Sequence, residues 1–185
     1  MTKVVQVGIV AAEGGPLVIG DSNALREWRG IEEGGDDYRR ACEVFVPTEV
    51  EGGTALTLRG ERVLVWEMRG GGVADVFRVH EDEVRIVRVW TDTDGPVDVA
   101  VATMVGSEST ILGEVDIPSG LIVVMWATES AEGVAEVGEG QLDGDFSVGN
   151  AALAVRCRPG RYRAVHDSIV GDFGQGRRCS LQRIS

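Results

Sequence analysis

The sequence is poor in lysine and histidine, with one lysine against 17 arginines and only His80 and His166. Neither Lys nor Arg occurs between Arg88 and Arg156. The run Leu121–Ala127 is the longest apolar stretch after the N-terminal segment, far shorter than the ~18 residues of a membrane-spanning helix. The net charge of −12 lacks the basic surface that phosphate neutralisation needs. We therefore expect neither a membrane protein nor a nucleic-acid-binding protein.

Cysteines are few, and their number is odd. Cys42, Cys157 and Cys179 have irregular spacing and form no CxxC pair, so they fit no zinc pattern. The N-terminal apolar stretch ends at Gly14-Gly15-Pro16 and does not resemble a secretion signal. We expect reduced, buried thiols in a cytoplasmic protein. A Cys157–Cys179 bridge is the alternative for an exported chain.

Sequence motifs of common enzymes are also missing. There is no GxSxG, no P-loop, no GxGxxG after a strand and no HExxH. The run His166-Asp167-Ser168 contains the residue types of a catalytic triad. Adjacent residues of a strand point to opposite faces, so these three cannot form that relay. We expect no catalytic residue, no metal site and no cofactor, and hence a protein that is not an enzyme.

Glycine and valine are abundant, at 26 and 29 of the 185 residues. Valine favours strands and glycine favours turns. The pattern predicts an α+β fold that is predominantly antiparallel β, built as hairpin-rich sheets or a sandwich. One or two short helices are expected near the N-terminus. The first, Asn23–Arg29, would be capped by Asp21-Ser22, and a helical turn over Tyr38–Cys42 would be capped by Asp36 or Asp37.

Three segments share the pattern of a β-hairpin, a short alternating run, a glycine-containing turn and a second alternating run. These segments are Ala55–Met68, Val115–Thr128 and Leu153–His166. Further predicted strands are Val4–Val10, Leu17–Ile19, Val84–Trp90, Val97–Val105 and Phe146–Val148.

A polar segment near the midpoint, Thr91–Pro96, is the best candidate for a linker. It divides the chain into residues 1–95, a β-rich half with short helices, and residues 96–185, a half of β-hairpins. The alternative is one continuous domain.

Charge is arranged differently in the two halves. The stretch Asp92–Asp145 holds twelve acidic residues and no base, and arginines cluster after it. One interpretation is an acidic surface that attracts a basic partner. The other is that the acids keep the protein soluble and pair with the arginines across the sheet. The partner-binding candidates are Glu129, Glu132, Glu136, Glu139, Asp143 and Asp145.

Three pieces between Gly14 and Val44 carry a family resemblance. They are Gly14-Gly15-Pro16-Leu17-Val18, then Trp28-Arg29-Gly30, then Asp37-Tyr38-Arg39-Arg40-Ala41-Cys42 with Val44. In order and spacing they resemble the opening of the Imm21 family, bacterial immunity proteins of polymorphic toxin systems. The resemblance implies a non-enzymatic protein that binds a cognate toxin, with a basic nuclease as one option, inside the producing cell. The motif residues expected to be structural are Gly14, Gly15, Pro16, Trp28, Gly30, Asp37, Tyr38, Arg40, Ala41 and Cys42.

Two other functions stay open. The first is a β-rich structural or accessory module that assembles with another protein or with itself. The second is an enzyme or small-ligand binder, which would need a pocket that gathers His80 or His166 with carboxylates. The sequence leaves the oligomeric state undetermined.

Overall fold

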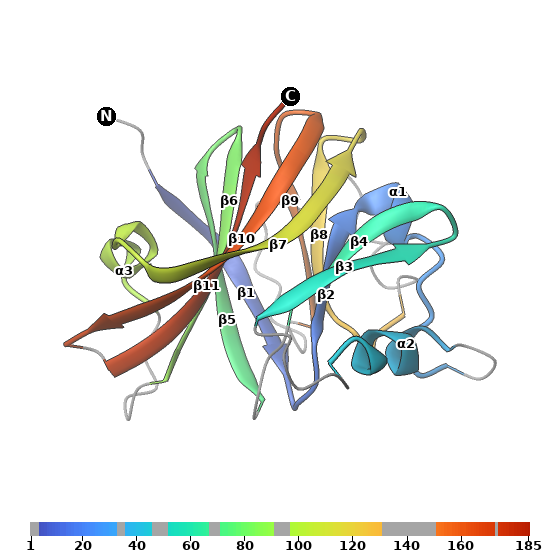
Figure 1. The fold of residues 1–185 in the computed structure, drawn as a ribbon, viewed down its shortest axis with the longest axis horizontal. Coiled ribbons are helices and arrows are strands. Elements are labelled where there is room, and N and C mark those ends of the chain that lie inside the picture. Colours follow the sequence, from blue (N-terminus) through green and yellow to red (C-terminus); the bar gives the residue numbers. More distant parts are fainter. Residues whose placement is uncertain are drawn as a thin grey trace.

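The computed structural model describes residues 4–32, 36–45, 52–66, 71–90, 97–130, 151–172 and 174–185. In this part of the chain the fold consists of two antiparallel sheets and three short helices (Figure 1). Sheet A has the strand order β1 (Val5–Ala12), β5 (Gly72–His80), β6 (Glu83–Trp90), β11 (Gly174–Arg183), β10 (Gly160–Gly171) and β7 (Ser107–Ile117). Sheet B has the order β3 (Gly53–Leu58), β4 (Glu61–Trp66), β2 (Leu17–Asp21), β8 (Leu121–Trp126) and β9 (Ala152–Arg156). The predominantly antiparallel β fold is confirmed.

Each sheet joins a block of strands from residues 1–95 to a block from residues 96–185. The blocks meet at the β6–β11 pair in sheet A and at the β2–β8 pair in sheet B. In each sheet, one pair of neighbouring strands therefore hydrogen-bonds the two halves of the chain to each other.

The main core lies between the inner faces of the two sheets. Val76 and Ile86 of sheet A pack in the same cluster as Ile19 and Val124 of sheet B, and all four are fully buried. All of β2 is buried, because it lies in the middle of sheet B with a covered surface on each face. A strand in such a place is apolar throughout, as the run Leu17–Ile19 is.

Helices cover the outer faces of the sheets (Figure 1). On sheet B, Leu25 of α1 (Ser22–Leu25), Trp28 and Ala41 of α2 (Asp37–Glu43) form a second buried cluster with the outward side chains of the strands. On sheet A, Val101 and Ala102 of α3 (Val99–Thr103) cover the third cluster. The protein is thus a sandwich with short helical segments on both outer faces.

Of the predicted hairpins, Ala55–Met68 is confirmed as β3–β4 for its described residues. Leu58 and Glu61 are opposite each other, and the turn residues Arg59 and Gly60 have φ of 49° and 90°. Two positive φ values are typical of the tight turn whose twist suits a hairpin. The hairpins β5–β6 and β10–β11 also occur, although no strand is predicted over β5 or β11.

The other two predicted hairpins are wrong. In Val115–Thr128 the chain passes from β7 in sheet A to β8 in sheet B, and in Leu153–His166 it passes from β9 in sheet B to β10 in sheet A. Turns that contain proline and glycine reverse the chain, but they do not decide which strand becomes the hydrogen-bonded neighbour. Tertiary contacts decide which strands pair. For example, Asp21 Oδ2 accepts the Ser119 N–H at 2.9 Å, and this contact holds the β7–β8 turn at the end of β2.

The predicted strand Val97–Val105 is also wrong, because Val99–Thr103 is the helix α3. The Asp98 carboxylate accepts the Ala100 N–H at 2.8 Å and caps this helix, which outweighs the strand propensity of its valines. The predicted strand Phe146–Val148 and the linker Thr91–Pro96 lie outside the described residues.

The two N-terminal helices differ in detail from the prediction. α1 ends at Leu25 and is shorter than the predicted Asn23–Arg29, although Asp21 does cap it through the Asn23 N–H. Asp37 is the first residue of α2 and not its cap, and its carboxylate accepts a hydrogen bond from outside the helix. No helix in the described part of the chain is long and apolar enough to cross a membrane.

Asp75 is a buried carboxylate beside the third cluster, on β5. Its Oδ1 accepts a hydrogen bond from Gln6 Nε2 at 2.5 Å, and the backbone N–H of Val97 also donates to the carboxylate. Burial raises the pKa of Asp75 to about 6, and the Val97 hydrogen bond opposes this only in part. The folded protein therefore binds a proton here more tightly than the unfolded chain does.

A group whose pKa is raised on folding makes the folded state lose stability as the pH rises through that pKa. We expect the free energy of unfolding of wild type, measured relative to that of Asp75→Asn, to fall by about 1–2 kcal/mol between pH 4.5 and pH 7. Urea unfolding at a series of pH values measures this difference. If the difference in free energy of unfolding between the two proteins stayed constant or grew with pH, the pKa of Asp75 would not be raised in the folded protein.

Candidate functional site

The three pieces of the Imm21-like motif are in contact in the structure. The Arg29 N–H donates to Asp37 Oδ2 at 3.0 Å, and the Tyr38 N–H donates to the carbonyl of Gly30 at 3.2 Å. A Cβ at Gly15 would lie 2.8 Å from Tyr38 Oη, so the first piece contacts the third. We call these pieces, Gly14–Val18, Trp28–Gly30 and Asp37–Cys42, the motif unit.

Hydrogen bonds join the motif unit to the end of β8. Trp28 Nε1 donates to the carbonyl of Ala127 at 3.0 Å, and the Ala127 N–H donates to the carbonyl of Pro16 at 3.0 Å. Trp126 Nε1 donates to the carbonyl of Gly14 at 2.6 Å. Since Trp28 is almost fully buried, its ring is held by packing as well as by this hydrogen bond.

The remaining motif residues lie on α2. Ala41 is fully buried in the second cluster, and Arg40 Nη2 donates to the carbonyl of Thr57 on β3 at 2.9 Å. A hydrogen bond with Cys42, together with burial, raises the pKa of the Tyr38 hydroxyl. These contacts all lie within the fold, and those of Ala41 and Arg40 join α2 to sheet B.

Gly30 of the motif unit and Ile31 directly after it contact Thr128, which precedes the acidic segment Glu129–Asp145. The Ile31 N–H donates to the carbonyl of Thr128 at 3.1 Å. Gly30 has φ of +56°, and a Cβ there would lie 2.0 Å from Thr128 O, so glycine is required. On the other side of the segment, the Trp126 N–H donates to the carbonyl of Ala151 at 2.7 Å. The two ends of the stretch between Glu129 and Ala151 therefore leave from one place at the end of β8.

Of the six partner-binding candidates, the structure places Glu129, which is half-buried and donates its N–H to the carbonyl of Trp126 at 3.0 Å. The other five lie outside the described residues: Glu132, Glu136, Glu139, Asp143 and Asp145.

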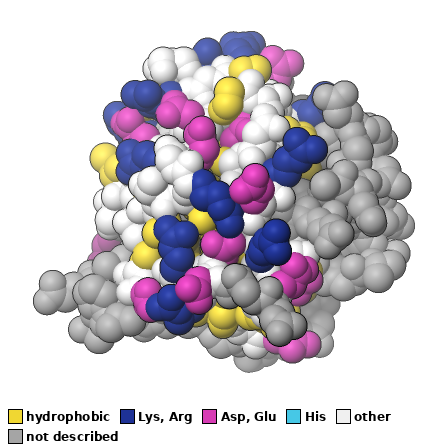
Figure 2. Space-filling view, turned by 90° about the vertical axis from the view of Figure 1, so that its right-hand side faces the viewer, with side chains coloured by type: hydrophobic (Ala, Val, Ile, Leu, Met, Phe, Trp, Pro, Cys, Tyr) yellow, Lys and Arg dark blue, Asp and Glu magenta, His cyan; other side chains and the backbone are white. Residues whose placement is uncertain are grey.

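Several acids outside this segment pair with the C-terminal arginines. Arg161 contacts Asp116 at 3.0 Å, and Arg163 contacts Glu114 at 3.2 Å, both between β10 and β7. Arg158 contacts Glu81 and Asp82 at the β5–β6 turn, both at 3.1 Å. On another face, which carries α1, α2, β3 and β4, charges of both signs are also interspersed (Figure 2). Arg178 and Arg183 also form ion pairs, with Asp167 and Asp82. Pairing across the sheet with acids of the stretch Asp92–Asp145, as one interpretation of the sequence predicts, occurs for Arg161 and Arg163.

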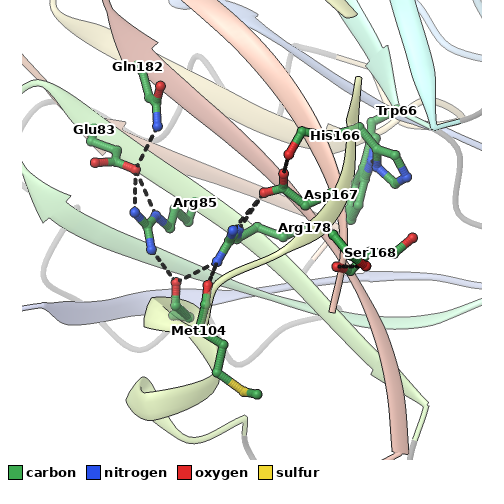
Figure 3. Close-up of polar contacts among 12 residues, drawn as sticks. Trp66, Glu83, Arg85, Met104, His166, Asp167, Ser168, Arg178 and Gln182 are labelled. Carbon is green, nitrogen blue, oxygen red and sulfur yellow. Dashed lines mark hydrogen bonds and ion pairs between the residues drawn. The ribbon is translucent and has the colours of Figure 1, made fainter. Parts of the chain in front are cut away.

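Neighbouring residues of β10 face opposite ways (Figure 3). His166 points toward sheet B, where its Nδ1 accepts a hydrogen bond from Trp66 Nε1 at 3.2 Å. Asp167 points to the outer face of sheet A, where its Oδ1 accepts a hydrogen bond from Ser109 Oγ. The prediction that His166-Asp167-Ser168 cannot work as a triad is confirmed.

A buried ion pair on the outer face of sheet A holds α3 in place (Figure 3). Arg178 Nε and Nη2 donate to Asp167 Oδ2 at 3.0 and 2.7 Å. Its Nη1 donates to the carbonyls of Ala102 and Met104, at 3.2 and 2.7 Å. Arg85 Nη1 donates to the carbonyl of Ala102 at 2.5 Å. Both cations thus bind carbonyls at the C-terminal end of α3, where positive charge is favourable.

A cavity of about 370 Å³ lies beside this ion pair, below the chain that links α3 to β7. Arg178, Asp167, Ser109 and Ser180 contribute polar atoms to its wall, and Val105 lies at its edge with 96% of its surface exposed. Neither histidine lines this cavity, so it does not gather the groups that an enzyme hypothesis requires.

His80 lies elsewhere, at the β5–β6 turn, where its Nδ1 accepts the Asp82 N–H at 3.0 Å. No group of three or more potential metal ligands occurs among the residues that the structure describes. Cys42, Cys157 and Cys179 are free thiols, so the alternative Cys157–Cys179 bridge is absent. Burial in the main core raises the pKa of the Cys179 thiol.

Comparison of the chain with protein-family models, with curated proteins and with solved structures gave no match. The motif unit was partly visible in the sequence, since its three pieces carry the Imm21 resemblance. The Asp167–Arg178 pair had no such signal, because its two residues become neighbours only when β10 pairs with β11.

We expect Arg178→Gln to lower the free energy of unfolding by about 3–5 kcal/mol, because it leaves the buried Asp167 carboxylate without its counter-charge. The matched control is Arg163→Gln, which breaks an exposed ion pair in the same sheet and should lower the free energy of unfolding by at most about 1 kcal/mol. Urea unfolding of the two variants compares them directly. Equal losses would show that the Asp167–Arg178 pair does not hold α3.

Proposed function

We propose that this protein is an immunity protein, which binds a protein toxin and blocks it without chemistry of its own. One observation carries the proposal: the residues that resemble Imm21 form a single unit, and this unit holds the start of the acidic segment at the end of β8. If the three pieces of such a motif serve the fold, they are expected to contact one another in this way.

The charge of the segment supports a basic partner. Residues 131–150 contain five acidic side chains and no base. In contrast, Glu114 and Asp116 on β7 already pair with arginines of the same sheet. The acidic segment is therefore the better candidate for attracting an external cationic surface. Such attraction raises the rate of association and selects the partner more than it adds affinity.

The proposed mechanism is steric. The carboxylates of the segment would take the place that nucleic-acid phosphates occupy on a basic nuclease, and the sandwich behind them would block access to the site. The firm anchoring of Thr128 and Ala151 suits this role, because a segment with fixed ends loses less conformational freedom on binding.

The test uses the polypeptide encoded immediately upstream of this chain's gene as the probe. We expect the triple variant Glu132→Lys, Glu136→Lys and Glu139→Lys to associate with it at least about tenfold more slowly than wild type at low salt. The difference should shrink at physiological ionic strength, where charges are screened beyond about 8 Å. Stopped-flow or surface-based kinetics at two salt concentrations measure both effects.

The matched control carries the same change of net charge at three exposed residues outside the acidic segment, with Glu27→Lys, Glu43→Lys and Glu61→Lys. Its association rate should stay within about threefold of wild type. An equal effect of the two triple variants would remove the acidic segment from the interface. A stable symmetric oligomer of the chain that does not bind the probe would favour the assembly module instead.

A further inference from the structure

The cavity beside the buried ion pair is built on the outer face of the neighbouring strands β6, β11 and β10. Ser180 of β11 lies at its floor, with Arg85 of β6 opposite it on one side and Val165 of β10 on the other. The link from α3 to β7 passes over this floor. A Cβ at Gly106 of the link would lie 2.5 Å from the Cβ of Asp167, so the link lies directly against the ion pair.

Ser180 presents an unused hydroxyl to the cavity. Its neighbours Cys179 and Leu181 belong to the main core, so the side chain of Ser180 points to the outer face. Ser180 is only 3% exposed, and its Oγ makes no hydrogen bond with the residues that the structure describes. A buried hydroxyl without a partner is unfavourable, so a ligand that hydrogen-bonds to this Oγ removes that cost.

The charges around the cavity cancel in pairs. Arg178 Nη2 is 2.7 Å from Asp167 Oδ2, and Arg85 Nη2 is 2.7 Å from Glu83 Oε1. Each guanidinium therefore has its own carboxylate. A charged ligand would lose its hydration without gaining an unpaired opposite charge. The balance of charge favours a ligand that has no net charge.

Other polar groups with remaining hydrogen-bond capacity surround the Ser180 hydroxyl. Arg178 has five N–H groups, and its contacts with its carboxylate partner and with the carbonyls at the end of α3 use four of them. Gln182 Nε2 donates to Glu83 at 3.3 Å, which leaves the amide oxygen of Gln182 as an acceptor. Donors and acceptors thus lie side by side. Adjacent hydroxyl groups of a ligand match such a site, because each hydroxyl both donates and accepts.

The size and the wall of the cavity narrow the ligand further. Its volume of about 370 Å³ is at the lower end of the range for small-molecule sites. No aromatic side chain is among the described residues that line it, so it lacks a stacking surface for a flat base. We propose that this cavity binds a small neutral polyol of the size of a monosaccharide, through Ser180, Arg178 and Gln182. The proposal does not depend on the proposed binding of a toxin.

The experiment titrates the full chain with D-glucose, D-galactose and myo-inositol. Calorimetry measures the affinity, and the NMR signals of the arginine Nε–H groups report on Arg85 and Arg178 directly. We expect saturable binding of at least one of these polyols, with shifts of both arginine signals.

Charged relatives of the sugars test the balance of charge. D-Glucuronate and D-glucosamine should bind at least about tenfold more weakly than the neutral polyol that binds best. If none of the three neutral polyols saturated, water alone would fill the cavity, and the proposal would be overturned. A charged relative that bound as tightly as the best neutral polyol, or more tightly, would also overturn it.

Two variants locate the site. Ser180→Ala breaks no side-chain hydrogen bond of the free protein, so its Tm should be no lower than that of wild type, while its affinity for the polyol should fall about five- to tenfold. Gln182→Leu, at an exposed position, removes the amide acceptor and should weaken binding by a similar factor.

The matched control is Ser168→Ala on β10. Asp167 points to the outer face, so the side chain of Ser168 lies on the opposite face and outside the cavity. Its affinity should stay within about twofold of wild type. Equal losses in Ser168→Ala and Ser180→Ala, or full binding by both Ser180→Ala and Gln182→Leu, would overturn the proposal.

Discussion

Side chains from two sheets meet in one buried core, and each sheet is completed by strands from both halves of the chain. Side chains of a strand alternate between its two faces, and each position that points into this core must be apolar or find a polar partner. On β10 the constraint sends His166 to Trp66 on the inner side and Asp167 to Arg178 on the outer side. The placement of the polar groups thus follows from the core.

Polar contacts hold the short helices on this sandwich as much as apolar contacts do. α3 has only five residues, and such a helix is unstable alone. It stays on sheet A because its valine and alanine cover a small cluster while Arg85 and Arg178 hold its last carbonyls. On sheet B, the motif unit serves the same purpose for α2. Ile31, directly after Gly30, binds Thr128, and Trp126 of β8 binds Ala151 at the other end of the acidic segment.

Much of the fold could be predicted where the signal is local. The hairpin pattern of Ala55–Met68 is confirmed at the turn Arg59-Gly60, whose two positive φ values twist the strands as pairing requires. The turns at Pro118-Ser119-Gly120 and Pro159-Gly160 look alike in sequence, yet they connect strands of different sheets. Nothing in a turn distinguishes reversal within a sheet from passage between sheets, since that depends on which face the next strand must bury.

The residues alone were enough for the β-rich class, the opposite facing of His166 and Asp167, and the segregation of charge into an acidic stretch and an arginine-rich end. Each of these depends on composition or on the period of a strand, which are properties of neighbouring residues. Tertiary structure decided that Asp167 meets Arg178, that Ser180 lies opposite Arg85, and that α3 is a helix. These outcomes depend on strand register and on the surface available for burial, which link residues far apart in the chain.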